Sequence, residues 1–107
     1  MIELKKVTSD EFEFLVKSES GKALLKSIPF ANEQLTHETL NGLSKTISTA
    51  KSFERKTNFN GQFLFELKNK EGKIIGSSGL YRSEAGMENG IKNLILQLKN
   101  QTPTNIV

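Results

Sequence analysis

The chain has 107 residues, 36% of them hydrophobic and 25% charged, with a formal net charge of +3. This composition is typical of one soluble globular domain over residues 1–107, and the sequence contains no apolar run near the ~20 residues that a membrane-spanning helix needs. The N-terminal stretch has charges where a signal peptide needs an apolar core, and the absence of cysteine excludes disulfides and suits a reducing cytoplasm, so we expect a cytoplasmic protein.

An internal repeat relates the two halves of the sequence. Residues 2–30 align with residues 53–81, and Asn41-Gly42 aligns with Asn89-Gly90, so the first copy has three more residues before its helix. Apolar positions, turn glycines and spacing match together, which indicates two tandem repeats over residues 1–51 and 52–100. The identical pairs include Phe12/Phe63, Phe14/Phe65, Gly21/Gly72, Lys22/Lys73 and Ser27/Ser78.

Each copy is predicted to contain three strands and then a helix. The first strand is short, about residues 2–6 and 52–57. The second strand alternates apolar residues with period two around Phe14 and Phe65, as a half-buried strand does. A turn with a glycine at positive φ closes the hairpin, and the third strand is KALLKS or KIIGSS.

The helix of the second copy is predicted to follow Ser83, a good N-cap. The first-copy helix is predicted to start at Thr36, with Leu35 and Leu40 placed for a hydrophobic staple, and a start near Asn32 is the alternative. The second helix has one apolar stripe, which consists of Met87, Ile91, Leu94, Ile95 and Leu98.

These elements predict an α+β domain, in which two tandem β-β-β-α repeats share one mainly antiparallel six-stranded sheet with two helices on one face. The second copy contains F-x-F-x-L-K-N-K-E-G-K-I-I-G-S-S-G-L-Y-R-S and then N-G-I. This run resembles the YegP-like family of small bacterial proteins of uncharacterised function, and its first-copy echo extends the resemblance over nearly the whole chain. The resemblance implies paired units in one sheet and no catalytic residues. The first copy departs from the pattern at KSIPFANEQLT, where a Gly-Ser-rich joint is expected.

The glycine-rich joint of the second copy is interpreted as structural and not as a phosphate-binding loop. No Lys follows Gly79, and the spacing G-x-G-x-x-G is absent. Gly76 and Gly79 are expected to relieve crowding where the strand bends into the helix. A mid-helix glycine costs about 1 kcal/mol relative to alanine, so at Gly42 and Gly90 we expect helix and sheet to approach too closely for a Cβ.

The sequence predicts no catalytic residues, no metal site and no cofactor, and therefore no enzyme. A Ser-His-Asp triad would need both His37 and Asp10, the only residues of their types, and these fall in a helix start and a turn. Ser77 and Ser78 have no other obvious base. One histidine without cysteine does not make a zinc site.

Arg55 is the clearest misfit of the pattern, because alternation places it on the inward side with Phe53, where the first copy has Leu4. Either its stem snorkels at the open end of the sheet, or it pairs with a buried acceptor. The lysines and arginines of the second copy account for the net positive charge. A speculative anion-binding patch in that copy consists of Arg55, Arg82, Lys73 and Ser83.

The leading functional hypothesis is a non-enzymatic cytoplasmic interaction module that recognises a protein or itself, with the outward residues Leu15 and Leu64 seeding the contact. The alternative is weak anion or nucleic-acid binding through the basic second repeat, although the phenylalanines are predicted to point mostly inward. A monomer is expected, since two units in one chain already supply the pairing. The tail, residues 101–107, is expected to be flexible.

Overall fold

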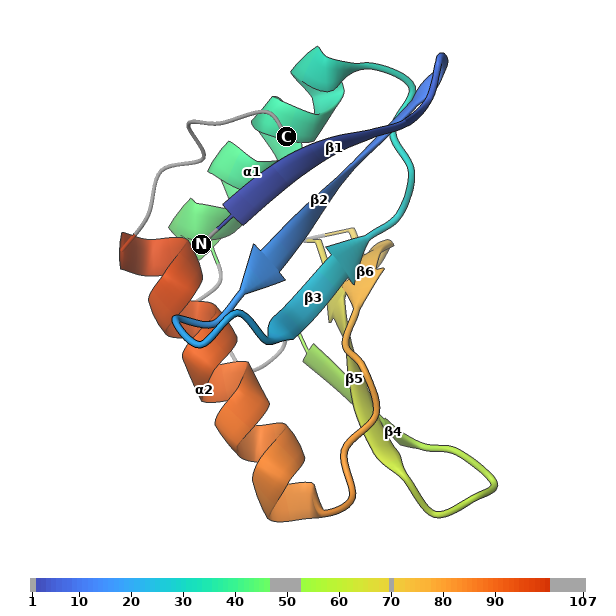
Figure 1. The fold of residues 1–107 in the computed structure, drawn as a ribbon, viewed down its shortest axis with the longest axis vertical. Coiled ribbons are helices and arrows are strands. Elements are labelled where there is room, and N and C mark those ends of the chain that lie inside the picture. Colours follow the sequence, from blue (N-terminus) through green and yellow to red (C-terminus); the bar gives the residue numbers. More distant parts are fainter. Residues whose placement is uncertain (1, 47–52, 70, 101–107) are drawn as a thin grey trace.

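The computed structural model describes residues 2–46, 53–69 and 71–100. Three strands and a helix occur twice along the chain (Figure 1), so the predicted element order is confirmed; the tail at 101–107 lies outside the described residues. The first half contains β1 (Ile2–Thr8), β2 (Glu11–Lys17), β3 (Ala23–Ser27) and α1 (Glu33–Thr46). The second half contains β4 (Phe53–Thr57), β5 (Phe63–Lys68), β6 (Ile74–Ser77) and α2 (Glu84–Asn100).

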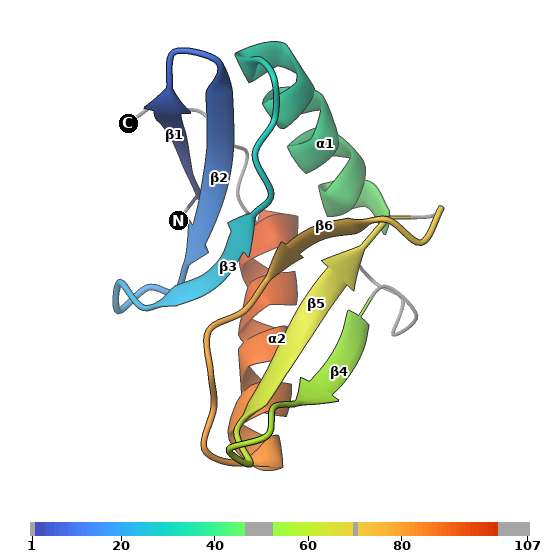
Figure 2. The same cartoon turned by 90° about the vertical axis from the view of Figure 1, so that its right-hand side faces the viewer.

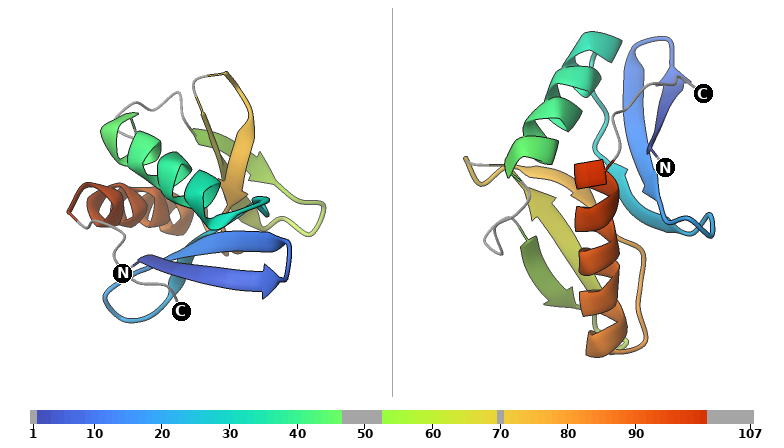
Figure 3. Two further views of the ribbon diagram at one scale, coloured as in Figure 1. Left: turned by 90° about the horizontal axis from the view of Figure 1, so that it is seen from above. Right: turned by 90° about the vertical axis from the view of Figure 1, so that its left-hand side faces the viewer.

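The six strands form one antiparallel sheet in the order β1-β2-β3-β6-β5-β4. From each edge of the sheet to its middle, the strands follow in chain order, β1-β2-β3 from one edge and β4-β5-β6 from the other, so that β3 and β6 are adjacent in the middle. The sheet is strongly twisted (Figure 2), and both helices lie on one of its faces (Figure 3). The α+β class is therefore confirmed, while the superposition of the two repeats stays a prediction.

The core lies between the sheet and the helices. Phe14 and Phe65 are completely buried at equivalent places in the two halves, and each stacks on a second ring. Phe14 stacks on Phe30 with ring centroids 6.2 Å apart, and Phe65 stacks on Tyr81 at 6.3 Å. The α2 stripe supplies the facing apolar surface, with Met87, Ile91, Leu94 and Leu98 buried and Ile95 packed against the core.

Two serines connect the strands in the same way in both halves. The Ser27 hydroxyl accepts a bond from the Phe14 amide at 2.9 Å and donates to the Ile28 carbonyl at 2.8 Å. The Ser78 hydroxyl accepts from the Phe65 amide and donates to the Gly79 carbonyl at the same distances. Ser78 thus replaces a missing backbone bond, which is a structural role.

The helix starts follow from their caps. The Ser83 hydroxyl accepts a bond from the Gly86 amide at 3.0 Å, which confirms the predicted start of α2. The predicted start of α1 at Thr36 is wrong, because the Asn32 side chain accepts from the Leu35 amide at 2.8 Å and the helix begins at Glu33. Asn caps a helix at least as well as Thr does, so the alternative start was correct.

The glycines of the hairpin turns and of the joint have different roles. Gly21 and Gly72 have φ values of 89° and 83°, so the predicted positive φ in both turns is confirmed. A Cβ on Gly76 would lie 2.7 Å from the carbonyl oxygen of Lys26. Gly76 thus relieves crowding between β6 and β3, and not at the bend into the helix. A Cβ on Gly79 would meet no atom within 4 Å, so the prediction was wrong for Gly79.

The two mid-helix glycines differ from each other. A Cβ on Gly90 would lie 2.7 Å from Cζ of Tyr81, so close packing is confirmed there, although the neighbour is a side chain of the β6–α2 connection and not the sheet itself. A Cβ on Gly42 would meet nothing within 4 Å. The prediction was therefore wrong for Gly42, which is exposed on α1. The predicted three additional residues before the first helix are also wrong, because α1 and α2 begin at Glu33 and Glu84, 51 positions apart like the strands, and Gly42 is thus not at the place of Gly90 in its helix.

Candidate ligand pocket between the two halves

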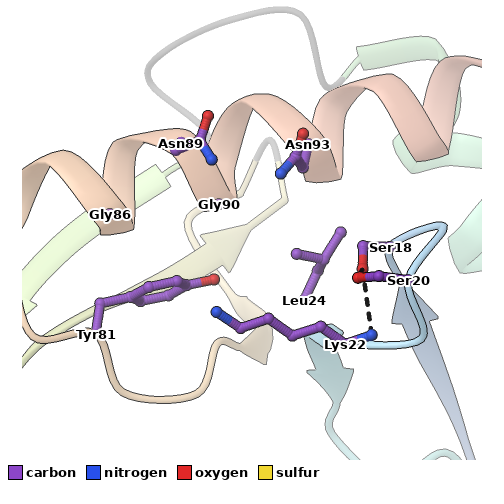
Figure 4. A pocket seen from close by; sticks show the side chains of 9 residues that line it. All are labelled: Ser18, Ser20, Lys22, Leu24, Tyr81, Gly86, Asn89, Gly90 and Asn93. Atoms are coloured by element: carbon purple, nitrogen blue, oxygen red, sulfur yellow. Dashed lines mark hydrogen bonds between the residues drawn. The ribbon is translucent and has the colours of Figure 1, made fainter.

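A hollow of about 260 Å³ lies between the β2–β3 turn of the first half and α2 of the second half (Figure 4). The turn, the β6–α2 connection and the middle of α2 each contribute side chains to its wall. It therefore exists only because the two halves share one sheet. The lining residues are Ser18, Ser20, Lys22, Leu24, Tyr81, Gly86, Asn89, Gly90 and Asn93.

Tyr81 supplies the most informative polar atom of this pocket. Its residue is only 8% exposed, and its hydroxyl has no hydrogen-bond partner among the described residues. The hydroxyl points into the hollow (Figure 4), and the missing side chain of Gly90 leaves room for it. Burial raises the pKa of the Tyr81 phenol above its ordinary value, so at neutral pH this group is an uncharged donor.

Lys22 supplies the positive charge of the pocket. Its Nζ lies 4.9 Å from the centroid of the Tyr81 ring, within the range of a cation–π contact. The turn holds the Lys22 backbone, since the Ser18 amide donates to its carbonyl at 2.8 Å and the Ser18 hydroxyl accepts from its amide at 3.2 Å. The charge is therefore attached to a closed turn and lies over the Tyr81 ring.

The remaining lining residues add neutral polar groups and one apolar surface. Asn89 and Asn93 are four residues apart on α2 and so lie on the same side of the helix. Ser18 and Ser20 share a hydrogen bond at 2.9 Å on the opposite wall, and the buried Leu24 lies between the two walls. Among the described residues, none of those that line the hollow is acidic. The arrangement therefore suits a small group that accepts hydrogen bonds or carries negative charge.

The speculative anion patch has a different geometry from the predicted one. Arg55 forms a two-pronged ion pair with Glu88 of α2, in which Nη2 donates to Oε1 at 2.9 Å and Nε donates to Oε2. This hydrogen bonding raises the pKa of Arg55 and lowers the pKa of Glu88. Arg55 thus pairs with a half-exposed carboxylate, and its guanidinium is already occupied by a carboxylate of the same chain.

Lys73 and Arg82 lie at opposite ends of β5. The Asn69 amide donates to the Lys73 carbonyl at one end of this strand, and Tyr81, next to Arg82, bridges to Phe63 at the other end. Six residues of strand separate these ends, which is roughly 20 Å. The Ser83 hydroxyl, next to Arg82, is engaged in capping α2. The structure therefore does not bring the four predicted residues together in one site.

Leu15 and Leu64 do not form a continuous surface either. Leu15 on β2 pairs with Lys26 on β3, and Lys26 pairs with Ser77 on β6. Leu64 lies on β5, three strand spacings from β2, which is roughly 14 Å. Both leucines are half-buried. They lie on the face opposite the helices, among cross-strand ion pairs that include Lys17–Glu3 and Lys56–Glu66 at 2.9 Å each.

Sequence reasoning missed the pocket, although one signal was present. Phe30 and Tyr81 occupy equivalent places in the two copies, so the second copy adds a hydroxyl where the first has none. A hydroxyl added to an otherwise apolar core position is a sign of a polar neighbour. That neighbour, Lys22, comes from the other copy, and only the sheet order brings it there.

The described residues bear on two further classes of site. They contain no group of three or more His, Asp or Glu side chains that could hold a metal ion. Within the same part of the chain, neither helix is long and apolar enough to cross a membrane.

The fold and the shared pocket define a small α+β protein of paired β-β-β-α units. Residues 59–96 match the model of the Domain of unknown function (DUF1508). The chain is 30% identical over 100 residues to a UPF0339 protein of Pseudomonas aeruginosa, which covers 94% of this chain and 87% of the relative. It is 29% identical over 100 residues to YegP of Escherichia coli, with 94% and 91% covered.

Two solution NMR structures have the same fold. The UPF0339 protein of Shewanella oneidensis superposes with a TM-score of 0.88 at 26% identity and covers 96% of this chain and 87% of its own. E. coli YegP, described as a protein of unknown function, superposes with a TM-score of 0.87 at 26% identity and covers 98% and 90%. The chain belongs to the YegP-like UPF0339 family.

Proposed function

We propose that this protein is a non-enzymatic interaction module of the cytoplasm, and that it holds a chemical group of its partner in the pocket between the β2–β3 turn and α2. The Tyr81 hydroxyl, which has no hydrogen-bond partner in the described part of the chain, carries this proposal. A buried polar group without a partner costs about 1–3 kcal/mol, and a bound acceptor would recover that cost. The lining supplies donors and one ammonium, which are the groups that reversible recognition needs.

A variant that closes the pocket tests the proposal. Ser20 is exposed at the mouth of the hollow, and Glu71 is the exposed residue at the same place in the second turn. Ser20→Trp should abolish the recovery of a specific partner from native cytosol, while Glu71→Trp should retain it. Nuclease treatment should leave the recovery unchanged. Equal recovery with both variants, or no specific partner for the unmodified protein, would contradict the proposal.

Weak nucleic-acid binding is a second candidate function, and one observation favours it. Phe59 is 99% exposed in the β4–β5 turn, so one phenylalanine does not point inward. The Asn58 side chain accepts bonds from the amides of Asn60 and Gln62 at 3.0 and 2.9 Å and thereby holds this turn. Arg82 follows Tyr81 at the same end of β5. An exposed ring can stack on a base, which contributes about 1–3 kcal/mol per base.

Anisotropy of a labelled single-stranded oligonucleotide tests this candidate. Phe59→Ala and Arg82→Ala should each weaken the binding, whereas Lys73→Ala, at the other end of β5, should not. The affinity should fall steeply as the salt concentration rises. Binding that is absent at low salt, or that is equally sensitive to the three substitutions, would contradict a site around Phe59.

A further inference from the structure

We infer that the group held in the pocket is a carboxylate, which the Lys22 ammonium and the Tyr81 hydroxyl bind together; this inference rests on the proposed function and names the chemistry of the recognised group. Both donors belong to one contact, since the Lys22 Nζ lies 4.9 Å from the centroid of the Tyr81 ring, whose hydroxyl has no partner among the described residues. A carboxylate has two acceptor oxygens, so one can receive the ammonium and the other the phenol.

The charge of the lining favours a single negative charge. Lys22 is the only cationic residue among the described residues of the lining, and the other described donors are neutral. A phosphate carries up to two charges and is usually bound at a helix N-terminus or by several cations. This pocket meets α2 from Gly86 in its first turn to Asn93, and the Gly86 amide already donates to the Ser83 hydroxyl. The remaining charge of the lining is one ammonium, which matches one carboxylate.

The size of the pocket limits what accompanies the carboxylate. About 260 Å³ is below the range of about 300–1,000 Å³ that is usual for drug-sized ligands. The buried Leu24 offers one apolar contact for a short aliphatic group. A small carboxylic acid and the carboxylate end of a peptide chain share this chemistry.

The test is a titration of the ¹⁵N-labelled protein at constant ionic strength. Sodium acetate should cause saturable amide shifts at Gly86 and Gly90, and neutral acetamide should not. Two peptides then distinguish a small carboxylic acid from the carboxylate end of a peptide chain. One is acetyl-dialanine with a free carboxylate, and the other is the same peptide with a C-terminal amide. Binding of the free peptide acid indicates a chain end, whereas binding of acetate without the peptide acid indicates a small molecule. Either result supports the inference.

The repeat supplies a matched control for the charge. Lys73 occupies in the second turn the place that Lys22 has in the first. Lys22→Gln should weaken acetate binding about tenfold, because hydrogen bonds to charged groups are among the stronger ones, while Lys73→Gln should leave it unchanged. Tyr81→Phe should also weaken binding without moving the backbone shifts of the free protein outside the pocket.

Three results would overturn the inference: no saturable shifts with acetate, equal shifts with acetamide, or equal effects of Lys22→Gln and Lys73→Gln. The proposed function has a separate outcome. Loss of partner recovery with Ser20→Trp, combined with no acetate binding, would keep the interaction module and remove the carboxylate. Acetate binding, combined with partner recovery that Ser20→Trp leaves unchanged, would keep the carboxylate site and remove the interaction module.

Discussion

The surroundings of Tyr81 in the second half differ from those of Phe30 in the first, although both rings stack on equivalent phenylalanines of the sheet. Tyr81 is buried beneath α2, and its ring leaves no space for a Cβ on Gly90. Phe30 is half-buried, and a Cβ on Gly42 would meet no atom. The two helices begin at Glu33 and Glu84, which are 51 positions apart like the strands, so Gly42 lies three residues farther along its helix than Gly90 does.

This difference shows how two similar units acquire one site. The second half keeps a tight packing of ring and helix and adds a hydroxyl, while the first half supplies the lysine that lies over the ring. Neither half contains the pocket alone. Substitutions at the crowded and the open places of these two halves should have unequal effects, and the following predictions are ordered by the size of the expected effect.

Gly76→Ala should have the largest effect on stability. Its Cβ would lie 2.7 Å from the Lys26 carbonyl and 3.1 Å from the Ser27 Cα, and both are backbone atoms of β3 that cannot move without breaking the centre of the sheet. We expect the free energy of unfolding to fall by about 3 kcal/mol, the upper part of the usual cost of overpacking. Urea denaturation measures it. Gly79→Ala, which meets open space, is the control, and equal losses would contradict the close approach.

Gly90→Ala and Gly42→Ala should change stability in opposite directions. Alanine at Gly90 would push against the Tyr81 ring and cost about 1–2 kcal/mol after its better helix propensity is included. Alanine at Gly42 meets no atom and should stabilise the protein by up to about 1 kcal/mol. Thermal unfolding of the two variants checks this. If both substitutions changed the stability in the same direction, the proposed close contact between Gly90 and Tyr81 would be contradicted.

Tyr81→Phe should raise the free energy of unfolding by about 1 kcal/mol, because it removes a buried hydroxyl that has no partner among the described residues. The reverse change in the first half, Phe30→Tyr, should alter it by less than about 0.5 kcal/mol, since the half-buried ring can place a hydroxyl in water. Denaturation curves of both variants measure the difference. A loss of stability in Tyr81→Phe would indicate that the hydroxyl already has a stabilising partner within the protein.

The smallest expected effect is a change of stability at alkaline pH that is linked to the ionisation of Tyr81. Tyr81 is the only tyrosine and the chain has no tryptophan, so absorbance of the phenolate reports one group. Its pKa in the folded protein should lie above the ordinary 10.0, because burial disfavours the charged form, and it should return to that value in urea.

The sign of the linked stability follows from the raised pKa. The contribution is fully present below the ordinary pKa and is lost as the pH rises through the folded pKa. The free energy of unfolding should therefore decrease above about pH 10. In Phe30→Tyr, the added phenol should titrate closer to 10.0, and two equally raised values would contradict the difference between the halves.

Local patterns predicted most of the elements. Alternation around Phe14 and Phe65, the glycine turns and the Ser83 cap were sufficient, because these signals act over a few residues. The start of α1 was misplaced because Asn32 and Thr36 are both acceptable caps, and the preference for Asn over Thr at an N-cap is too small to decide between them. The ion pair of Arg55 with Glu88 was not predicted, since the alternatives were snorkelling or a buried acceptor, and Glu88 is half-exposed and 33 residues away.

The candidate site was not predictable in the same way. Arg55, Arg82, Lys73 and Ser83 were grouped because they share a basic second copy, but sequence proximity does not place side chains at the same end of a strand. Lys73 and Arg82 are separated by the length of β5. Lys22, which does lie beside Tyr81, belongs to the other copy.

By itself, the sequence determined the α+β class, the element order and the positions of the tight turns, because hydrophobic periodicity and turn chemistry are properties of short segments. Only the tertiary structure decided which glycines are crowded, which cations are paired, and that the turn of one half faces the helix of the other. Those outcomes depend on the pairing of β3 with β6, which joins residues about 50 positions apart. The unpartnered Tyr81 hydroxyl beside Lys22 is a consequence of that pairing.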